Sequence, residues 1–260
     1  MIGVAMGDPG LDEAIRAAGG ITELARKLGI AQPSVSNWSR VPAARVLEVE
    51  AATGVGRAIL RPDLYDERAR LDEIDQARAQ EYALLSTLLA RAPDAALLKR
   101  LARLSGDETP LGTAHAALAE ASAASLERIE REFFDLFIGI GRGELLPYAS
   151  YYLTGFLHER PLAALRGALA ELGIDRAAEV KEPEDHIAAL CEVMSGLILG
   201  SFDTPASLAR QREFFDAFIA PWAMRFFRDL KGANSARFYA AVGRIGELFL
   251  EVEETAFAIA

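Results

Sequence analysis

Residues 182–198 read EPEDHIAALCEVMSGLI, an acidic, proline-containing segment that runs directly into an apolar helical pattern. Within it, apolar residues recur at steps of three and four, as on one face of an α-helix, at Ile187, Leu190, Cys191, Met194, Leu197 and Ile198. The same spacing returns in three other stretches: Leu126, Ile129, Phe133 and Phe137; Leu162, Leu165, Leu169 and Leu172; and Phe238, Val242, Ile245, Phe249 and Val252. The sequence shows no alternating strand pattern and no Asn-Gly or Asp-Gly hairpin signal. It therefore predicts an all-α fold.

Glycine and proline residues divide these helical stretches. Breaks are expected at residues 105–110, at residues 139–147 and at Gly173. Pro221 lies within the apolar-periodic run 205–230 and should kink or split that helix, because proline removes a backbone donor and clashes with the preceding turn.

The charged segment 61–75 is the expected boundary between two domains, a small one over residues 1–66 and a larger helical bundle over residues 67–260. The net charge of −10 is uneven, since residues 1–66 hold seven basic and eight acidic residues and so contribute only −1. The remaining −9 makes the larger domain a poor match for nucleic acid. It suits a basic partner, such as an arginine-bearing peptide.

Several functional classes are not supported by the sequence. The longest apolar stretches are interrupted by charge, and residues 1–10 lack a secretory signal pattern, so a cytoplasmic protein without membrane insertion is expected. Cys191 is the only cysteine, and the histidines at 115, 158 and 186 lack metal-ligand spacing. The glycines of residues 139–143 have no preceding strand and no following Lys-Ser/Thr. We therefore expect no cofactor, no metal and no catalysis.

Residues 21–40 fit the geometry of a helix-turn-helix. Leu24 and Leu28 would face inward, Ala25 is the small residue at the crossing of the two helices, and Gly29 forms the turn. Val35 and Trp38 would form the inner face of the second helix. That packing leaves a polar outer set, which can contact base edges and phosphates in double-stranded DNA: Gln32, Pro33, Ser36, Asn37 and Arg40.

Residues 11–66 resemble the Cro/YdaS-like helix-turn-helix family. The resemblance is carried by residues 21–29, by the run QPSVSNW at 32–38 and by the tail LRPDLY at 60–65. Ala31 departs from the pattern, since such proteins often have a serine there. The resemblance implies DNA binding as a homodimer on a two-fold site. The alternative is a helical module that no longer binds DNA, because a net charge of −1 gives little attraction for phosphates.

Two loop segments of the larger domain have an unusual composition: GIGRGELLPY at 139–148, followed by ASYY, and EPEDH at 182–186. Acidic residues at a helix N-terminus favour the helix dipole and cap free N–H groups. Capping would account for Glu184 and Asp185, but it gives no reason for His186. The other carboxylates on helices are expected on solvated faces.

These segments resemble those of the TorD-like chaperone family, over about residues 74–255. The family pattern is an aromatic helix, here Phe133-Phe134-x-x-Phe137, then a glycine loop, then Ser150-Tyr151-Tyr152 and a Glu-Pro-x-Asp-His hinge. The C-terminal order also matches, through Gln211, Phe214-Phe215, Trp222, Phe238-Tyr239 and Glu251. Ile140 stands where many members have proline, which should alter the stiffness of the loop. Residues 151–157 look like members that accompany formate dehydrogenases.

The resemblance implies a chaperone that binds the catalytic subunit of a molybdenum-cofactor oxidoreductase, or its twin-arginine signal peptide, without catalysis. The residues it implicates are Tyr148, Ser150, Tyr152, Glu182, Pro183, Asp185 and His186. Glu182 and Asp185 would bind arginine, His186 would tune that contact, and the two tyrosines would stack on guanidinium groups. The alternative is that the hinge and the glycine loop mainly organise helix packing.

Two hypotheses for the whole chain follow. In the first, it is a maturation chaperone whose N-terminal module tethers or dimerises it. In the second, it is a transcription regulator whose TorD-like domain senses apoenzyme or signal peptide and reports to a promoter. The first predicts client binding without sequence-specific DNA binding, whereas the second predicts both, thermodynamically coupled.

Overall fold

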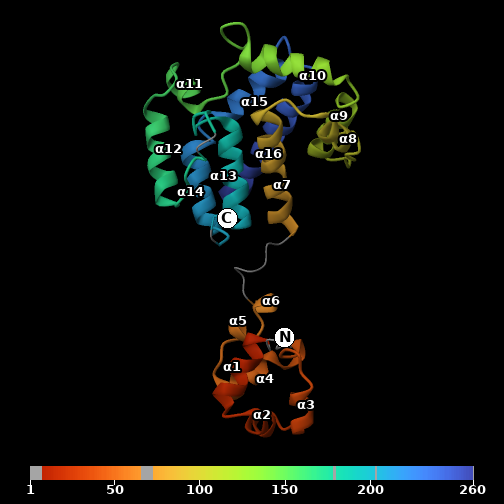
Figure 1. Cartoon of the computed structure of the whole chain (residues 1–260), viewed down its shortest axis with the longest axis vertical. Helices are drawn as coiled ribbons and strands as arrows, with labels where there is room; N and C mark the ends of the chain where they lie inside the picture. The colour runs from red at the N-terminus through yellow and green to blue at the C-terminus, as the bar shows by residue number, and fades with distance from the viewer. Residues whose placement is uncertain (1–7, 66–72, 178–179, 203, 260) are drawn as a thin grey trace, which may run out of the picture. The chain divides into compact units, whose positions relative to one another are not determined.

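The structure, a computed structural model, describes residues 8–65, 73–177, 180–202 and 204–259. It divides into two compact units, residues 1–71 and residues 72–260 (Figure 1). The predicted all-α class is confirmed, because the described residues form helices and their only β-type pairing is an isolated bridge between Tyr148 and His186. The boundary predicted between residues 66 and 67 lies outside the described residues, as do residues 1–7.

The first unit is built from short helices: α1 (Pro9–Ala18), α2 (Ile21–Lys27), α3 (Gln32–Ser36), η1 (Ala43–Arg45), α4 (Val46–Thr53), α5 (Arg57–Leu60) and α6 (Pro62–Tyr65). As predicted, Leu24, Ala25 and Val35 are buried between α2 and α3. Leu28 and Trp38 are partly buried against the same core. Gly29 forms the turn with φ of +66°, a left-handed conformation that glycine adopts without strain.

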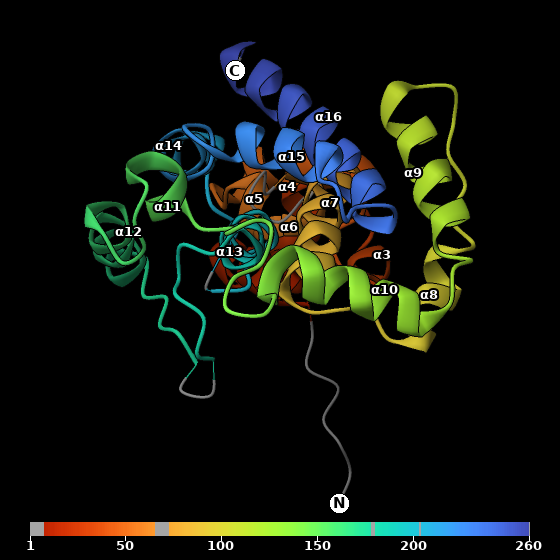
Figure 2. The same ribbon diagram turned by 90° about the horizontal axis from the view of Figure 1, so that it is seen from above.

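The second unit contains α7 (Glu73–Ala90), α8 (Ala95–Leu101), α9 (Pro110–Ala121), α10 (Leu126–Phe133), η2 (Phe134–Ile138), α11 (Ala149–Thr154), α12 (Arg160–Glu171), α13 (Ile187–Leu199), α14 (Leu208–Phe218), α15 (Ala223–Gly232) and α16 (Phe238–Ile259). Helix α13 packs along α7 in the middle of the unit, and α16 packs against α15 and α9. Helices α8 and α9 lie on one side of this unit, and α11 and α12 on the other (Figures 1 and 2).

The helical patterns were partly right about burial. The break expected at Pro221 is present, because α14 ends at Phe218 and α15 begins at Ala223. Helix α13 buries more than the one predicted face, since Ala188 and Val193 are buried as well. The prediction for Val252 is wrong, because its side chain is 53% exposed. The end of α16 contacts the rest of the unit through other side chains, chiefly those of Glu253 and Phe257.

A buried ion pair joins α7 to α16. The Arg78 guanidinium donates to both oxygens of Glu253, at 2.6 and 2.9 Å, and the Tyr82 hydroxyl donates to the same carboxylate at 3.0 Å. Arg78 also donates to the side-chain oxygen of Gln211 on α14, at 3.0 Å. The Glu253 side chain is fully buried, so the expectation that helix carboxylates lie on solvated faces is wrong here. Arg78 thereby links three helices, α7, α14 and α16.

A second buried carboxylate, that of Glu132 at the end of α10, caps the start of α16. It accepts from the backbone N–H groups of Arg237, Phe238 and Tyr239, at 2.7, 3.2 and 2.7 Å. The first N–H groups of a helix have no partner within that helix. Glu132 supplies a hydrogen-bond acceptor for these N–H groups from a position more than 100 residues earlier in the chain.

Replacing Glu253 by Ala should lower the free energy of unfolding by about 3–5 kcal/mol, because it leaves the Arg78 charge buried without its partner. The matched control is Glu251→Ala, which removes an exposed carboxylate from the same helix and should change stability by less than about 0.5 kcal/mol. Urea unfolding of the two variants measures the difference. Equal losses would contradict the assigned role of the ion pair.

Candidate functional site

The hinge 182–186 connects α12 to α13, and its Asp185 caps a different helix from the one that follows it. Its Oδ2 accepts from the Ser150 backbone N–H at 2.8 Å, and its carbonyl accepts from the Ala149 N–H at 3.0 Å. The side chain is 1% exposed. Asp185 therefore fixes the start of α11. The expectation that it caps the helix beginning at Ile187 is corrected.

His186 is the residue that caps α13. Its Nδ1 accepts from the Ala188 N–H at 3.1 Å, so the neutral ring carries its proton on Nε2. The ring is 8% exposed and packs edge-on against Tyr148, with ring centroids 5.1 Å apart. Burial lowers the pKa of His186 to about 4, although Glu182 and Asp185 act in the opposite direction. N-terminal capping of α13 thus accounts for His186, which the sequence alone left unexplained.

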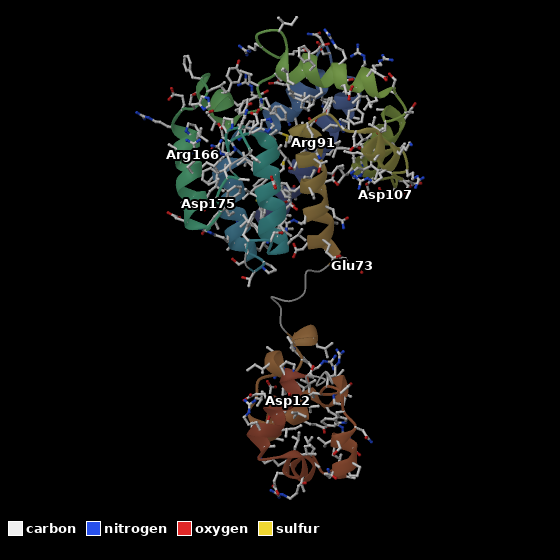
Figure 3. All side chains as sticks on the ribbon, in the orientation of Figure 1. Asp12, Glu73, Arg91, Asp107, Arg166 and Asp175 are labelled. Atoms are coloured by element: carbon white, nitrogen blue, oxygen red, sulfur yellow. The ribbon has the colours of Figure 1, made fainter. Side chains whose placement is uncertain are left out.

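The other two acidic residues of the hinge, Glu182 and Glu184, are more exposed than Asp185 and His186. Glu184 forms ion pairs with Arg166 of α12, at 2.8 Å, and with Arg176, at 3.5 Å (Figure 3 labels Arg166). Glu182 is exposed and accepts from the Tyr148 hydroxyl at 2.5 Å. Glu184 therefore ties the hinge to α12, whereas Glu182 remains open to solvent beside an aromatic ring.

The glycine loop begins where the π-helical segment η2 ends. The Gly139 N–H donates to the Phe134 carbonyl at 2.7 Å, and a Cβ at Gly139 would lie 2.1 Å from the Arg142 carbonyl oxygen. Farther along, the Glu144 carboxylate accepts from the Asn234 and Ser235 N–H groups, at 2.6 and 3.0 Å. Burial would raise the pKa of Glu144, but these N–H groups hold it below its usual value. The loop is therefore anchored to the turn between α15 and α16.

An open hollow of about 390 Å³ lies between this loop, α11 and α15; its lining includes Arg142, Glu144, Tyr151, Tyr152, Arg225 and Asp229. Two guanidinium groups lie over tyrosine rings there, Arg142 over Tyr151 at 5.1 Å and Arg225 over Tyr152 at 5.7 Å. The Tyr152 hydroxyl donates to Asp229 at 3.1 Å. The hollow combines aromatic surfaces with charges of both signs.

The loop and α11 also expose large apolar side chains. Ile140, at the turn of the loop, is 96% exposed, and Phe156, just after α11, is 68% exposed. Ile138 and Leu153 are about half exposed on the same segments. Exposed apolar side chains of this size, next to polar groups, are typical of surfaces that contact other proteins.

The structure brings together most of the residues predicted for client binding. Tyr148, Glu182 and His186 meet where the hinge passes the start of α11, with Pro183 half-buried beside them. Ser150 is fully buried, and its Oγ and the Asp185 Oδ1 have no hydrogen-bond partner among the described residues. Tyr152 lies in the hollow instead, with side chains of α15.

Sequence reasoning missed Arg225 and Asp229, which complete the environment of Tyr152. They are four residues apart on α15, a spacing that usually indicates only a surface ion pair. Tyr152 and Asp229 are 77 residues apart in sequence, so no local pattern connects them.

In the first unit, all the residues predicted to contact DNA are exposed on α3 and the turn that follows it: Gln32, Pro33, Ser36, Asn37 and Arg40. Gln32 donates to the Ser36 hydroxyl at 2.9 Å along the outer face of α3. Asn37 caps the C-terminus of this helix. The five side chains thus form one accessible polar surface.

Two further types of site are absent from the described residues. No helix there is both long and apolar enough to cross a membrane. Nor does that part of the chain bring together three or more histidine, cysteine or acidic side chains that could hold a metal ion.

Both units are similar to known families. The family model for the nitrate reductase delta subunit matches residues 104–228, and the model for the bacterial toxin YdaS matches residues 11–69. The chaperone protein TorD of Aliivibrio salmonicida is 31% identical over 138 residues, which are 50% of this chain and 64% of that protein. TorD of Vibrio atlanticus is 29% identical with the same coverage. The chain thus spans less than two thirds of the length of these relatives.

A crystal structure described as a redox enzyme maturation protein, from Archaeoglobus fulgidus, aligns with 71% of this chain and 99% of its own. The TM-score is 0.46 and the sequence identity is 20%. The chain joins a helix-turn-helix unit of the YdaS family to a C-terminal unit of the TorD-like, nitrate reductase delta subunit family.

Proposed function

We propose that this protein is a cytoplasmic chaperone for the maturation of a molybdenum-cofactor oxidoreductase, acting by binding and not by catalysis. Its client is the immature catalytic subunit or its twin-arginine signal peptide, with a formate dehydrogenase as one candidate. The observation that carries the proposal is a pair of tyrosine–carboxylate contacts, Tyr148 with Glu182 at the N-cap of α11 and Tyr152 of α11 with Asp229, beside the exposed Ile140 of the glycine loop. The similarity to chaperone proteins named TorD supports it.

A tyrosine ring next to a carboxylate is suited to bind arginine. The ring face attracts the guanidinium, and the carboxylate accepts charge-assisted hydrogen bonds from it. Arg225 provides an example within the protein, since it lies over the Tyr152 ring with its Nε 3.9 Å from Asp229. Glu182 and Tyr148 offer the same chemistry, and no arginine of the described residues lies over the Tyr148 ring. The apolar loop would then contact the hydrophobic part of the client segment.

Asp185 and His186 have an indirect role in this proposal. Both are buried, and each accepts from a backbone N–H at a helix start. Together with Ser150 and Pro183 they fix where α11 and the hinge lie. They thereby hold Tyr148 and Glu182 in place for the client, without touching it.

The N-terminal unit would bind double-stranded DNA through α3. The exposed polar side chains of Gln32, Ser36, Asn37 and Arg40 favour this role. A second candidate function follows from it: a transcription regulator in which client binding to one unit changes the DNA affinity of the other. A homodimer would place two α3 helices on a two-fold site.

For the client site, the double variant Glu182→Gln with Asp229→Asn should weaken binding of a twin-arginine peptide by about 10–100-fold, since two charge-assisted contacts are lost. Fluorescence anisotropy with a labelled peptide measures this, with a Lys-Lys peptide for comparison. The control, Glu213→Gln with Asp216→Asn, removes the same charge from exposed positions on α14. Similar weakening in both variants would show that only net charge matters.

His186 should make stability depend on pH between about 4 and 6.5. Its pKa in the folded state lies below its usual value of 6.5, so the stability it contributes is complete above pH 6.5 and is lost as the pH falls toward 4. At pH 5 the loss should be about 2 kcal/mol. His186→Asn, which keeps a capping acceptor but does not titrate, should lack this component in urea unfolding from pH 7 to 4.5. Parallel curves for the two proteins would refute a buried, neutral histidine.

The DNA ligand for this test is a promoter fragment recovered with the protein from cells. The double variant Asn37→Ala with Arg40→Ala should bind this fragment at least tenfold more weakly, because base-edge contacts are lost. Arg16→Ala, an exposed cation on α1, serves as the control. Gel shifts against the recovered fragment and a scrambled one measure the loss. Unchanged binding by the double variant would refute the assignment of α3 as the DNA-contacting helix.

A further inference from the structure

A group of cations lies on and next to α8, on the opposite side of the second unit from α11 and α12 (Figures 1 and 2). Arg91, Lys99, Arg100 and Arg103 are all exposed, and within the described part of the chain none of them has a hydrogen-bond or ion-pair partner. Residues 91–103 hold only one acid, Asp94, which gives the segment a net charge of +3. Most other arginines of the second unit form ion pairs, as Arg210 and Arg212 do on α14.

The packing of α8 turns these cations outward. Leu98 and Leu101 are buried and hold the helix against the unit, while Lys99 and Arg100 are exposed beside them. The one acid is already engaged, because the Asp94 Oδ1 accepts from the Leu97 N–H at 2.7 Å as the N-terminal cap of α8. Among the described residues, Asp94 forms no ion pair with these cations.

One further exposed arginine lies near α8. Lys99 lines an open hollow of about 250 Å³ that is shared with Ala124, and Ala124 also lines a neighbouring hollow whose charged residues are Arg128, Arg237, Glu120 and Glu132. Arg128 is exposed and, among the described residues, has no ion-pair partner. Figure 3 labels Arg91, which directly follows α7. Lys99 and Arg128 thus line adjoining hollows, and Arg100 and Arg103 follow Lys99 closely in sequence.

We propose that this corner, formed by Arg91, Lys99, Arg100, Arg103 and Arg128, binds the phosphate backbone of double-stranded DNA. The inference rests on the DNA-binding part of the proposed function. Residues 1–66 have a net charge of −1, whereas phosphate neutralisation normally supplies most of the affinity of a DNA-binding protein. Cations on the second unit would supply the missing contacts, and the chain connection raises their effective concentration at the same duplex.

The overall acidity of the second unit does not prevent this contact. At physiological ionic strength, exposed charges are screened over about 8 Å, so a phosphate at this corner is affected mainly by the local cations. Because these side chains form no internal ion pairs, no such pair has to be broken on binding. The corner also lies on the opposite side of the unit from α11 and α12, so it leaves the proposed client site free (Figures 1 and 2).

The test measures binding of the full chain to a 30-base-pair duplex of random sequence as a function of salt. The patch variant carries Lys99→Ala, Arg100→Ala and Arg103→Ala. The control carries Arg131→Ala, Arg210→Ala and Arg212→Ala, which removes the same charge from exposed, ion-paired positions. Each lost phosphate contact lowers the slope of log K against log salt by about 0.9, so the patch variant should lose between one and three slope units.

The control variant should keep the wild-type slope, and circular dichroism should show both variants folded. Equal slopes in wild type and patch variant would overturn the proposal, as would an equal loss in both variants. Loss of poly-glutamate binding with an unchanged DNA slope would assign the corner to an acidic protein partner and would also overturn it. Because the duplex has a random sequence, the result does not depend on knowing an operator. Binding of the twin-arginine peptide by the patch variant reports separately on the client site.

Discussion

The second unit depends on carboxylates that accept backbone N–H groups from helix starts and turns far away in sequence. Glu132 caps α16, Glu144 holds the turn before it, and Asp185 caps α11. Each bond satisfies donors that a helix or turn cannot satisfy itself, and each fixes one element relative to another. Hydrophobic burial brings these helices together without direction. The carboxylates specify where each helix begins, and so where the connecting loops can run.

In and around the hinge, the residues that are exposed to solvent differ from the buried residues that fix the local structure. Asp185 and His186 are buried in the hinge, whereas Tyr148, Glu182, Tyr152 and Asp229 are exposed or partly exposed. A sequence motif combines both kinds of residue in one short string, because a short segment can place one side chain inward and the next outward. Asp185 and His186 are therefore not the hinge residues that the proposed client would contact.

The sequence was sufficient for what depends on local spacing. Periodicity predicted the helical class, Pro221 predicted the break between α14 and α15, and the offsets around Gly29 predicted the buried residues of the helix-turn-helix. It was not sufficient for the polar contacts. Glu253 is 175 residues from Arg78 and Glu144 is 90 residues from Asn234, so nothing local distinguishes these carboxylates from solvated ones. Asp229 was missed for the same reason, since its partner Tyr152 is 77 residues away. His186 was misjudged although its capping contact, with the Ala188 N–H, is local.

The π-helical segment η2 lies between an ordinary α-helix and the glycine loop. A π turn holds one more residue than an α turn, so it is equivalent to a single-residue insertion absorbed without breaking the helix. Removing one residue from Phe134–Ile138 would allow α-helical bonding through this segment and would leave the residues on either side of it in register. The π turn would be lost, and with it the present bond from the Gly139 N–H to the Phe134 carbonyl. The glycine loop would then begin from an ordinary α-helical C-terminus.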